Sequence, residues 1–129
     1  MSATILIIED NAQNRYLATF LLEQNGFRVV AAVDGPSGLA LAADSPPDLI
    51  LLDIQLPKMD GYEVARRLRG QPALGEVSIV AVTSYAMPGD REKALAAGCD
   101  GYVEKPLDPD PCVGQVAAFL PGPGREESP

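Results

Sequence analysis

Three carboxylate side chains stand directly after short apolar segments of this sequence. Glu9 and Asp10 follow Ile8, the last residue of one apolar run, and Asp53 follows Leu52 at the end of another. Carboxylates brought together repel one another unless a cation neutralises them, and Mg²⁺ best suits hard oxygen ligands at this density. Glu9, Asp10 and Asp53 therefore form a candidate magnesium site, provided that the fold brings the two segments together.

An ordinary structural role explains some of these residues but not all. Acidic side chains commonly end strands and cap helices, which by itself could account for Glu9, Asp10 and the Asn11 that follows. Asp53 has no such explanation, because it is flanked by apolar residues and lies far from an evident helix start. A carboxylate at the end of a buried segment favours a functional role.

Two more apolar segments end in side chains that can handle phosphate. Thr83 follows Val82, and Lys105 comes shortly after Tyr102 and Val103. Taken singly, a threonine at a strand end and a surface lysine need no functional explanation. Together with the carboxylates they supply a nucleophile, a metal site, a hydroxyl donor and an ammonium group, which is the set that in-line phosphoryl transfer needs.

Five short apolar runs predict the elements that position these residues. The runs are rich in Ile, Val and Leu, begin 20 to 29 residues apart, and cover residues 4–8, 28–32, 48–52, 77–82 and 100–103. Such runs are typical of strands buried on both faces, and the spacing leaves room for a helix after each strand. Repeated strand-helix units predict an α/β fold, an open five-stranded parallel sheet with helices on both faces. Right-handed crossovers favour the flavodoxin-like, doubly wound order 2-1-3-4-5, in which the first and third strands are neighbours.

The segments between the strands carry apolar residues at helical spacing. The stripes expected to face the core are Tyr16/Phe20 with Leu17/Leu21, Leu39/Ala42/Ala43, Val64/Leu68 and Ala94/Leu95. Asn11 is a candidate N-cap and Gly26 a candidate C-terminal stop for the first of these helices. A fifth helix over residues 108–120 is predicted to be short, because Gly114 lies inside it and Pro121 ends it.

The composition is that of an ordinary globular domain, and it excludes several kinds of function. The 129 residues are 47% hydrophobic and 22% charged, which supports one folded domain over residues 1–120, followed by a disordered Pro/Gly-rich tail over residues 121–129. The net charge of -8 argues against binding to nucleic acid or to an anionic membrane. Histidine is absent, so Ser-His-Asp and Cys-His nucleophile systems are excluded. No apolar run approaches the length of a membrane span and the two cysteines form no CxxC pair, which favours a cytoplasmic location.

Four blocks of the sequence resemble the receiver domain of two-component response regulators. They are the acidic pair Glu9-Asp10, DLILLDIQLPKMDG at residues 48–61, VTSYA at residues 82–86, and GCDGY at residues 98–102 leading to Lys105-Pro106. The resemblance extends over about residues 4–120. It implies a phosphorelay signalling protein and not an enzyme with separate substrates, since a receiver catalyses only its own phosphorylation and dephosphorylation.

The resemblance assigns a role to each residue of the acidic cluster. Asp53 would be the phosphoacceptor, forming an acyl phosphate from a phosphohistidine. Mg²⁺ would be held by Asp10, Asp53 and the backbone carbonyl of Gln55, with Glu9 acting mainly through water.

It also assigns roles to residues on the other strand ends. Lys105 would pair with one phosphoryl oxygen, and Thr83 would donate its hydroxyl group to another. Tyr102 would be the aromatic switch that turns inward as Thr83 moves. Gly61 would permit the turn after the phosphorylated strand, and Tyr85 stands at a variable position that tunes hydrolysis of the acyl phosphate.

The partners follow from the same resemblance. A histidine kinase or a histidine phosphotransfer protein would supply the phosphoryl group. A downstream protein would bind the face formed by the predicted fourth helix, fifth strand and fifth helix. The chain ends about nine residues after that helix, so we expect a stand-alone regulator of the chemotaxis or cell-cycle type. The alternative is a receiver fragment of a larger response regulator or hybrid histidine kinase.

Three competing functions fit the sequence less well. A flavodoxin-like electron carrier needs Ser, Thr or Gly donors in its first loop, where Glu9 and Asp10 would repel a phosphate. A phosphohydrolase with an aspartyl nucleophile usually has a second Asp two residues later, and Gln55 at that position cannot shuttle protons. A receiver-like scaffold that is never phosphorylated would normally lack Asp53, Lys105 or the acidic pair.

Overall fold

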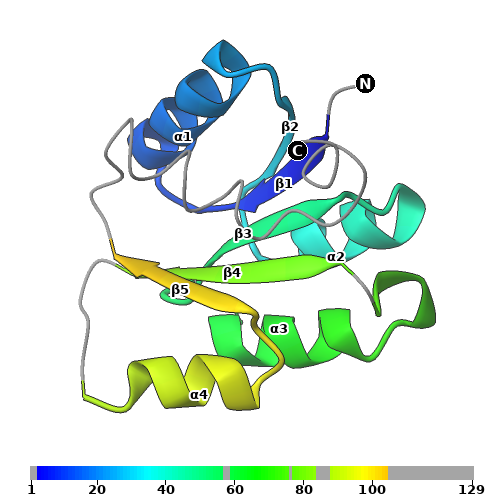
Figure 1. Ribbon diagram of the computed structural model, residues 1–129, viewed down its shortest axis with the longest axis vertical. Helices are drawn as coiled ribbons and strands as arrows, with labels where there is room; N and C mark the ends of the chain where they lie inside the picture. The colour runs from blue at the N-terminus through cyan, green and yellow to red at the C-terminus, as the bar shows by residue number, and fades with distance from the viewer. Residues whose placement is uncertain (1–2, 57–58, 76, 84–87, 105–129) are drawn as a thin grey trace, which may run out of the picture.

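The computed structural model describes residues 3–56, 59–75, 77–83 and 88–104, which form a sheet of strands joined by helices (Figure 1). The elements in chain order are β1 (Thr4–Ile8), α1 (Ala12–Gln24), β2 (Arg28–Ala32), α2 (Gly35–Asp44), β3 (Leu49–Asp53), α3 (Gly61–Arg69), a 3₁₀ turn (Pro72–Leu74), β4 (Ser78–Thr83), α4 (Asp90–Ala96) and β5 (Gly101–Glu104). The predicted fifth helix, the predicted tail and the proposed division at residue 120 lie outside the described residues.

The strands of the sheet are parallel and follow the order β2-β1-β3-β4-β5, which confirms the predicted topology. Ile8 at the end of β1 pairs with Leu52 of β3, and Asp53 pairs with Val82 of β4. The carboxyl ends of these three strands therefore lie side by side. In an open parallel sheet, ligands bind outside this edge, next to the point where the strand order reverses.

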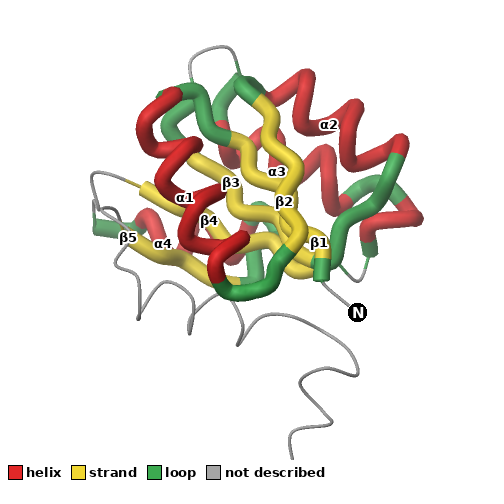
Figure 2. Tube along the Cα trace, turned by 90° about the horizontal axis from the view of Figure 1, so that it is seen from above, coloured by secondary structure: helices red, strands yellow, loops and turns green. Residues whose placement is uncertain are grey.

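Helices cover both faces of the sheet, and each face has its own apolar core. On one face, Ala18 and Leu22 of α1 pack with inward-facing strand residues such as Leu51. On the other face, α2, α3 and α4 pack against Leu52 and its neighbours. Figure 1 shows α1 on one side of the strands and α3 and α4 on the other, and in Figure 2 α1 crosses over the yellow strands. Successive residues of β3 therefore belong to different cores, as the side-chain period of two requires.

Three strands begin and end one residue later than the sequence predicts, namely β3, β4 and β5. Just before β3 and β5, an aspartate side chain accepts a backbone N–H from the neighbouring strand. Asp48 accepts the N–H of Thr4 at 2.7 Å, and Asp100 accepts the N–H of Ile79 at 2.8 Å. At the other end the shift makes Asp53 and Thr83 strand residues, so their backbones are held by the sheet.

The prediction that the strands are buried on both faces is wrong for β2. Only Ala32 of this strand is buried, whereas Val30 and Ala31 are exposed. β2 stands at one edge of the sheet and pairs only with β1 among the described strands. An edge strand has a neighbouring strand on one side only, so its side chains are less covered than those of a central strand of the same composition.

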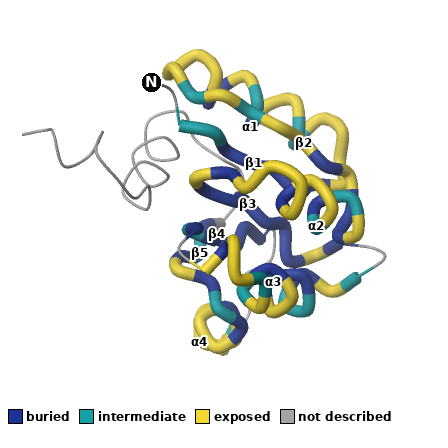
Figure 3. The backbone as a smooth tube through the Cα atoms, turned by 90° about the vertical axis from the view of Figure 1, so that its right-hand side faces the viewer, coloured by how far each residue is buried: buried dark blue, intermediate teal, exposed yellow. Residues whose placement is uncertain are grey.

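The predicted core face of α1 is also wrong in part. The core residues of α1 are Ala18, Leu21 and Leu22. Tyr16 is 72% exposed and Phe20 is 48% exposed, and their rings stack with centroids 6.4 Å apart. Leu17 is exposed as well. In Figure 3 much of α1 is accordingly coloured as exposed, and the residues that pack on the sheet from this helix include the small Ala18 together with Leu22.

The other helical stripes are confirmed in most positions. Val64 and Leu68 of α3 are buried as predicted. In α2 and α4, one member of each adjacent pair reaches the core: Ala42 and Ala94 are buried, whereas Ala43 and Leu95 are exposed.

The predicted ends of α1 are confirmed. The side chain of Asn11 accepts a hydrogen bond from the N–H of Asn14 at 2.9 Å, as an N-cap does. Gly26 follows the helix with φ of 89°, a left-handed conformation that favours glycine.

Candidate functional site

Glu9, Asp10 and Asp53 come together at the carboxyl edge of the sheet. One carboxylate oxygen from each residue lies within 4.8 Å of the others. Glu9 is 5% exposed and Asp53 is 4% exposed, whereas Asp10 faces solvent. Two buried carboxylates are poorly solvated by water, so this set of oxygen donors suits a hard divalent cation. The exposed side at Asp10 would give such a cation access to the site.

Glu9 also helps to turn the chain from β1 into α1. Its backbone N–H donates to the carbonyl of Ala32 at 3.0 Å, which extends the contact between β1 and β2 by one residue. Its carboxylate oxygen Oε2 accepts the N–H of Asn11 at 3.1 Å. The capping role that the sequence allowed for this segment is thus present, and it coexists with the acidic cluster.

Asp53 is the last residue of β3 and is fixed on both sides. Its Oδ1 accepts the backbone N–H of Gln55 at 2.8 Å, which orients the carboxylate. The next residue, Ile54, donates its N–H to the carbonyl of Val82 at 3.1 Å, so the chain stays attached to β4 beyond the strand. The side chain of Gln55 is exposed. The nucleophile candidate therefore has a defined direction before any ligand binds.

Gly61 lies directly against the peptide group that follows Asp53. Its N–H donates to the carbonyl of Ile54 at 3.3 Å. A Cβ at this position would overlap the Cα of Ile54 and lie 2.9 Å from the carbonyl oxygen of Asp53. The φ of Gly61 is not in the left-handed region. The reason for glycine is therefore close backbone approach, and not the turn conformation that the sequence suggested.

Thr83 and Tyr102 lie on neighbouring strands. Thr83 is completely buried at the end of β4, opposite Glu104 of β5. Tyr102 is half-buried and packs against the core beneath α2, α3 and α4. The guanidinium carbon of Arg91, on α4, lies 5.9 Å from the centroid of its ring, within the range of a cation–π contact. Lys105 and Tyr85, to which the sequence gave roles, lie outside the described residues.

A hydrogen bond between α3 and α4 was not predicted. The hydroxyl group of Tyr62 donates to Oδ1 of Asp90 at 3.2 Å. Burial, together with the hydrogen bond to this carboxylate, raises the pKa of Tyr62 to about 12. Tyr62 directly follows Gly61, so the contact connects the loop after Asp53 to the start of α4. Nothing in the local sequence pairs two residues that are 28 positions apart.

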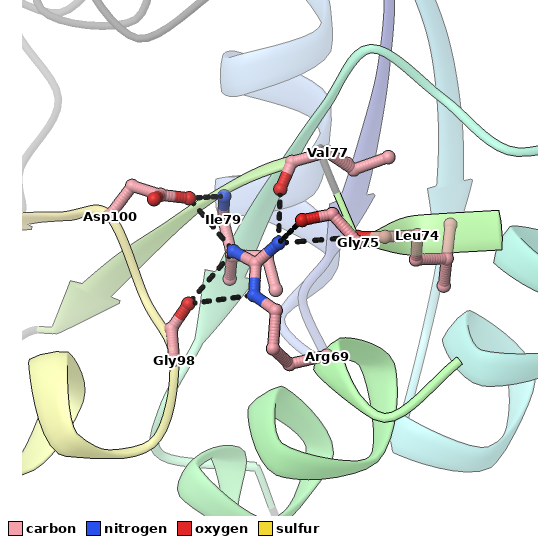
Figure 4. Close-up of polar contacts among 7 residues, drawn as sticks. All are labelled: Arg69, Leu74, Gly75, Val77, Ile79, Gly98 and Asp100. Carbon is pink, nitrogen blue, oxygen red and sulfur yellow. Dashed lines mark hydrogen bonds and ion pairs between the residues drawn. The ribbon is translucent and has the colours of Figure 1, made fainter. Parts of the chain in front are cut away.

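Arg69 at the end of α3 makes the densest set of polar contacts in the described part of the chain, shown in Figure 4. Its guanidinium group donates to the carbonyl of Gly98 at 2.8 and 3.1 Å and to the carboxylate of Asp100 at 2.8 Å. It also donates to the carbonyls of Leu74, Gly75 and Val77, at 3.2, 3.1 and 2.8 Å. These contacts join α3, the loop before β4 and the loop before β5, on the edge of the sheet opposite the acidic cluster.

A parallel sheet of this strand order, with an acidic cluster where the first and third strands end, is the architecture of a signal-receiving domain. A family model described as the response regulator receiver domain matches residues 5–117, and the chain belongs to this family. Its sequence is 36% identical over 120 residues to the polar-differentiation response regulator DivK of Brucella ovis, covering 93% of this chain and 98% of that protein.

Solved structures agree with this assignment. The chemotaxis protein CheY4 of Vibrio cholerae has a TM-score of 0.89 and 27% identity, covering 93% of this chain and 100% of that one. The receiver domain of the sensor histidine kinase PA1611 from Pseudomonas aeruginosa has a TM-score of 0.85 and 34% identity, covering 92% and 98% of the two chains. That structure holds a magnesium ion coordinated in its active-site cleft. Over the residues described for the present chain, no helix is both long and apolar enough to cross a membrane.

Proposed function

We propose that Asp53 is the residue at which this receiver domain is phosphorylated. The observation that carries the proposal is the convergence of Asp53 with Glu9 and Asp10, whose carboxylate oxygens lie within 4.8 Å of one another at the carboxyl edge of the sheet. Asp53 is the member that belongs to a strand, and its Oδ1 is oriented by the N–H of Gln55. A nucleophile held in this way loses little freedom when it reacts.

The proposed reaction is transfer of a phosphoryl group from a phosphohistidine to the carboxylate. An oxygen of Asp53 attacks phosphorus, the new O–P bond forms as the N–P bond to imidazole breaks, and the neutral imidazole leaves with a proton from solvent. Thr83 would donate its hydroxyl group to one phosphoryl oxygen and Lys105 would pair with another. Movement of Thr83 toward the phosphoryl group would let Tyr102 turn inward, which shifts an existing equilibrium between two conformations.

The acidic cluster would hold one Mg²⁺ ion. Asp10, Asp53 and the backbone carbonyl of Gln55 would be the protein ligands, and Glu9 would act through water. When bound, the ion supplies positive charge that offsets the negative charge of the phosphoryl group and the carboxylates. The exposed position of Asp10 supports exchange of the ion with solvent, and Mg²⁺ commonly keeps several waters in such sites.

The partners in this proposal are a histidine kinase or histidine phosphotransfer protein as donor and a downstream protein as target. The target would bind the face formed by α4, β5 and the predicted fifth helix. A stand-alone regulator is supported by the extent of the match to DivK and CheY4, of which 98% and 100% are covered. The receiver of PA1611 belongs to a sensor histidine kinase, so a receiver within a larger protein is the second candidate. Either protein would work in the cytoplasm, where ATP is available to histidine kinases as the source of the phosphoryl group.

Substitution of the proposed phosphoacceptor tests the reaction. Asp53→Asn should form no acid-labile and hydroxylamine-labile phosphoprotein from a small phosphodonor with Mg²⁺. Asp44→Asn, which changes an exposed aspartate at the end of α2, is the matched control and should be labelled like the parent protein. Retained labelling of Asp53→Asn would mean that another residue is the nucleophile.

A further inference from the structure

Arg15 reaches back from α1 to the backbone of the acidic pair. Its Nη1 donates to the carbonyl oxygen of Glu9 at 2.9 Å and to that of Asp10 at 3.3 Å. Arg15 is the fourth residue of α1, and its own N–H donates to the carbonyl of Asn11 at 2.9 Å. Helical side chains lean toward the N-terminus, so this position brings a long side chain over the loop that precedes the helix.

The two carbonyl groups lie where regular backbone bonding ends. β1 ends at Ile8 and α1 begins at Ala12, so Glu9 and Asp10 lie between the ladder of the sheet and the hydrogen bonds of the helix. A guanidinium group bound to a carbonyl makes a charge-assisted hydrogen bond, which is stronger than one between neutral groups. Because Arg15 is only half-buried, these hydrogen bonds form without complete desolvation of its charged group.

We propose that Arg15 is a positioning residue for the cation site. By holding the peptide groups of Glu9 and Asp10, it fixes the direction in which both carboxylates leave the backbone, toward Asp53. Loss of a group that orients metal ligands typically lowers metal affinity by about 10- to 100-fold. The inference rests on the proposed function only in taking Asp10 and Asp53 as ligands of Mg²⁺.

The positive charge of the same guanidinium group acts on Mg²⁺ affinity in the opposite direction, which makes the inference testable. A positive charge near the site repels a divalent cation, so removal of the charge by itself would raise Mg²⁺ affinity. Loss of positioning would lower it. Arg15→Lys retains the charge but replaces the planar group with a single ammonium group. Arg15→Gln removes the charge and leaves a short amide that cannot span the same distance.

The experiment is a Mg²⁺ titration followed by NMR, with thermal unfolding as a check on the fold. Positioning predicts that both variants bind Mg²⁺ more weakly, by about tenfold, while unfolding without metal stays close to that of the parent. Arg28→Gln is the control for charge, since Arg28 is exposed at the opposite end of the strands and its loss should leave affinity nearly unchanged. Parent-like affinity in Arg15→Lys with tighter binding in Arg15→Gln would overturn the proposal.

A readout without metal separates this inference from the site itself. The N–H of Asn11, which binds Oε2 of Glu9, should exchange with solvent faster in Arg15→Gln than in the parent, because the loop has lost its anchor. Unchanged exchange would overturn the role of Arg15 even if Mg²⁺ affinity fell. Asp10→Asn, titrated in parallel, tests the ligand assignment: weaker binding in that variant with parent-like Arg15 variants would reject only the inference about Arg15.

Discussion

The hydroxyl group of Tyr62 lies 3.2 Å from Oδ1 of Asp90 and joins the first turn of α3 to the first residue of α4. The next residue along α4, Arg91, lies over the ring of Tyr102 on β5. Two consecutive residues at the start of α4 therefore connect it to α3 and to β5. One of these contacts involves the residue next to Gly61, and the other involves the proposed switch.

Tyr62 should ionise well above the usual range of a tyrosine pKa. Its pKa is raised from 10.0 to about 12 by burial and by the hydrogen bond to Asp90. A raised tyrosine pKa means that the fold favours the protonated form, so its contribution to stability is complete below pH 10 and is lost as the pH rises from 10 to about 12. Ultraviolet titration of tyrosinate should lose a step near pH 12 in Tyr62→Phe, whereas Tyr16→Phe, which changes an exposed tyrosine, should retain it.

Arg91→Gln should make the activated conformation easier to reach. A cation–π contact at an exposed site contributes about 0.5–1 kcal/mol and here restrains Tyr102 in its observed position. If Tyr102 turns inward on activation, its release should tighten binding of beryllofluoride, a phosphoryl mimic, by about twofold to fivefold with Mg²⁺. Lys93→Gln makes the same charge change on α4 without touching Tyr102. Equal affinities for the two variants would show that Arg91 acts only through its charge.

Gly61→Ala should disturb the phosphoacceptor as well as stability. The added methyl group would overlap the Cα of Ile54 and crowd the carbonyl of Asp53, and such overpacking commonly costs about 1–3 kcal/mol. We expect slower phosphorylation by a small phosphodonor together with a lower unfolding free energy. Gly75→Ala is the control, because a Cβ there meets nothing closer than the Pro72 carbonyl at 3.6 Å. Parent-like phosphorylation in Gly61→Ala would contradict the expected effect of this contact on the phosphoacceptor.

Arg69→Met should destabilise the fold more than the loss of other arginines on α3. Methionine retains much of the apolar stem but leaves the carbonyls of Gly98 and Val77 without their arginine donor. Asp100 loses its ion pair and retains the N–H of Ile79. A hydrogen bond to a charged group contributes about 1.5–3 kcal/mol net. Because the Arg69 contacts are partly exposed and share one guanidinium group, we expect a total loss of about 3 kcal/mol in urea unfolding. Arg66→Met breaks an exposed pair with Glu63 and should cost less than about 0.5 kcal/mol. Similar losses for both would show that water replaces the Arg69 contacts.

The sequence was sufficient to predict the sheet order and the meeting of the three carboxylates. Buried parallel strands read as continuous apolar runs, and the topology rules leave few ways to connect them. Once the order is known, residues that end the first and third strands must lie at the same edge. This is why Asp53 could be placed near Glu9 although they are far apart in the chain.

The face of α1 and the contacts of α3 and α4 could not be predicted in the same way. Tyr16 and Phe20 have the same helical spacing as Ala18 and Leu22, and spacing alone cannot show which stripe faces the sheet. Arg69 has no local pattern either, because its partners lie in two other loops. Such contacts depend on packing between elements, and they become visible only in three dimensions.

The two ends of α4 are contacted in different ways within the described residues. Arg69 makes three hydrogen bonds to Gly98 and Asp100 beyond the last turn, whereas Tyr62 and the ring of Tyr102 contact the first turn. We therefore expect α4 to pivot about its Gly98 end. Its seven residues span about 10 Å, so a rotation of about 10° moves the first turn by about 2 Å while the pivot stays in place. A rearrangement at Tyr102 would then pass through Arg91 to the surface that the first turn of α4 presents to solvent.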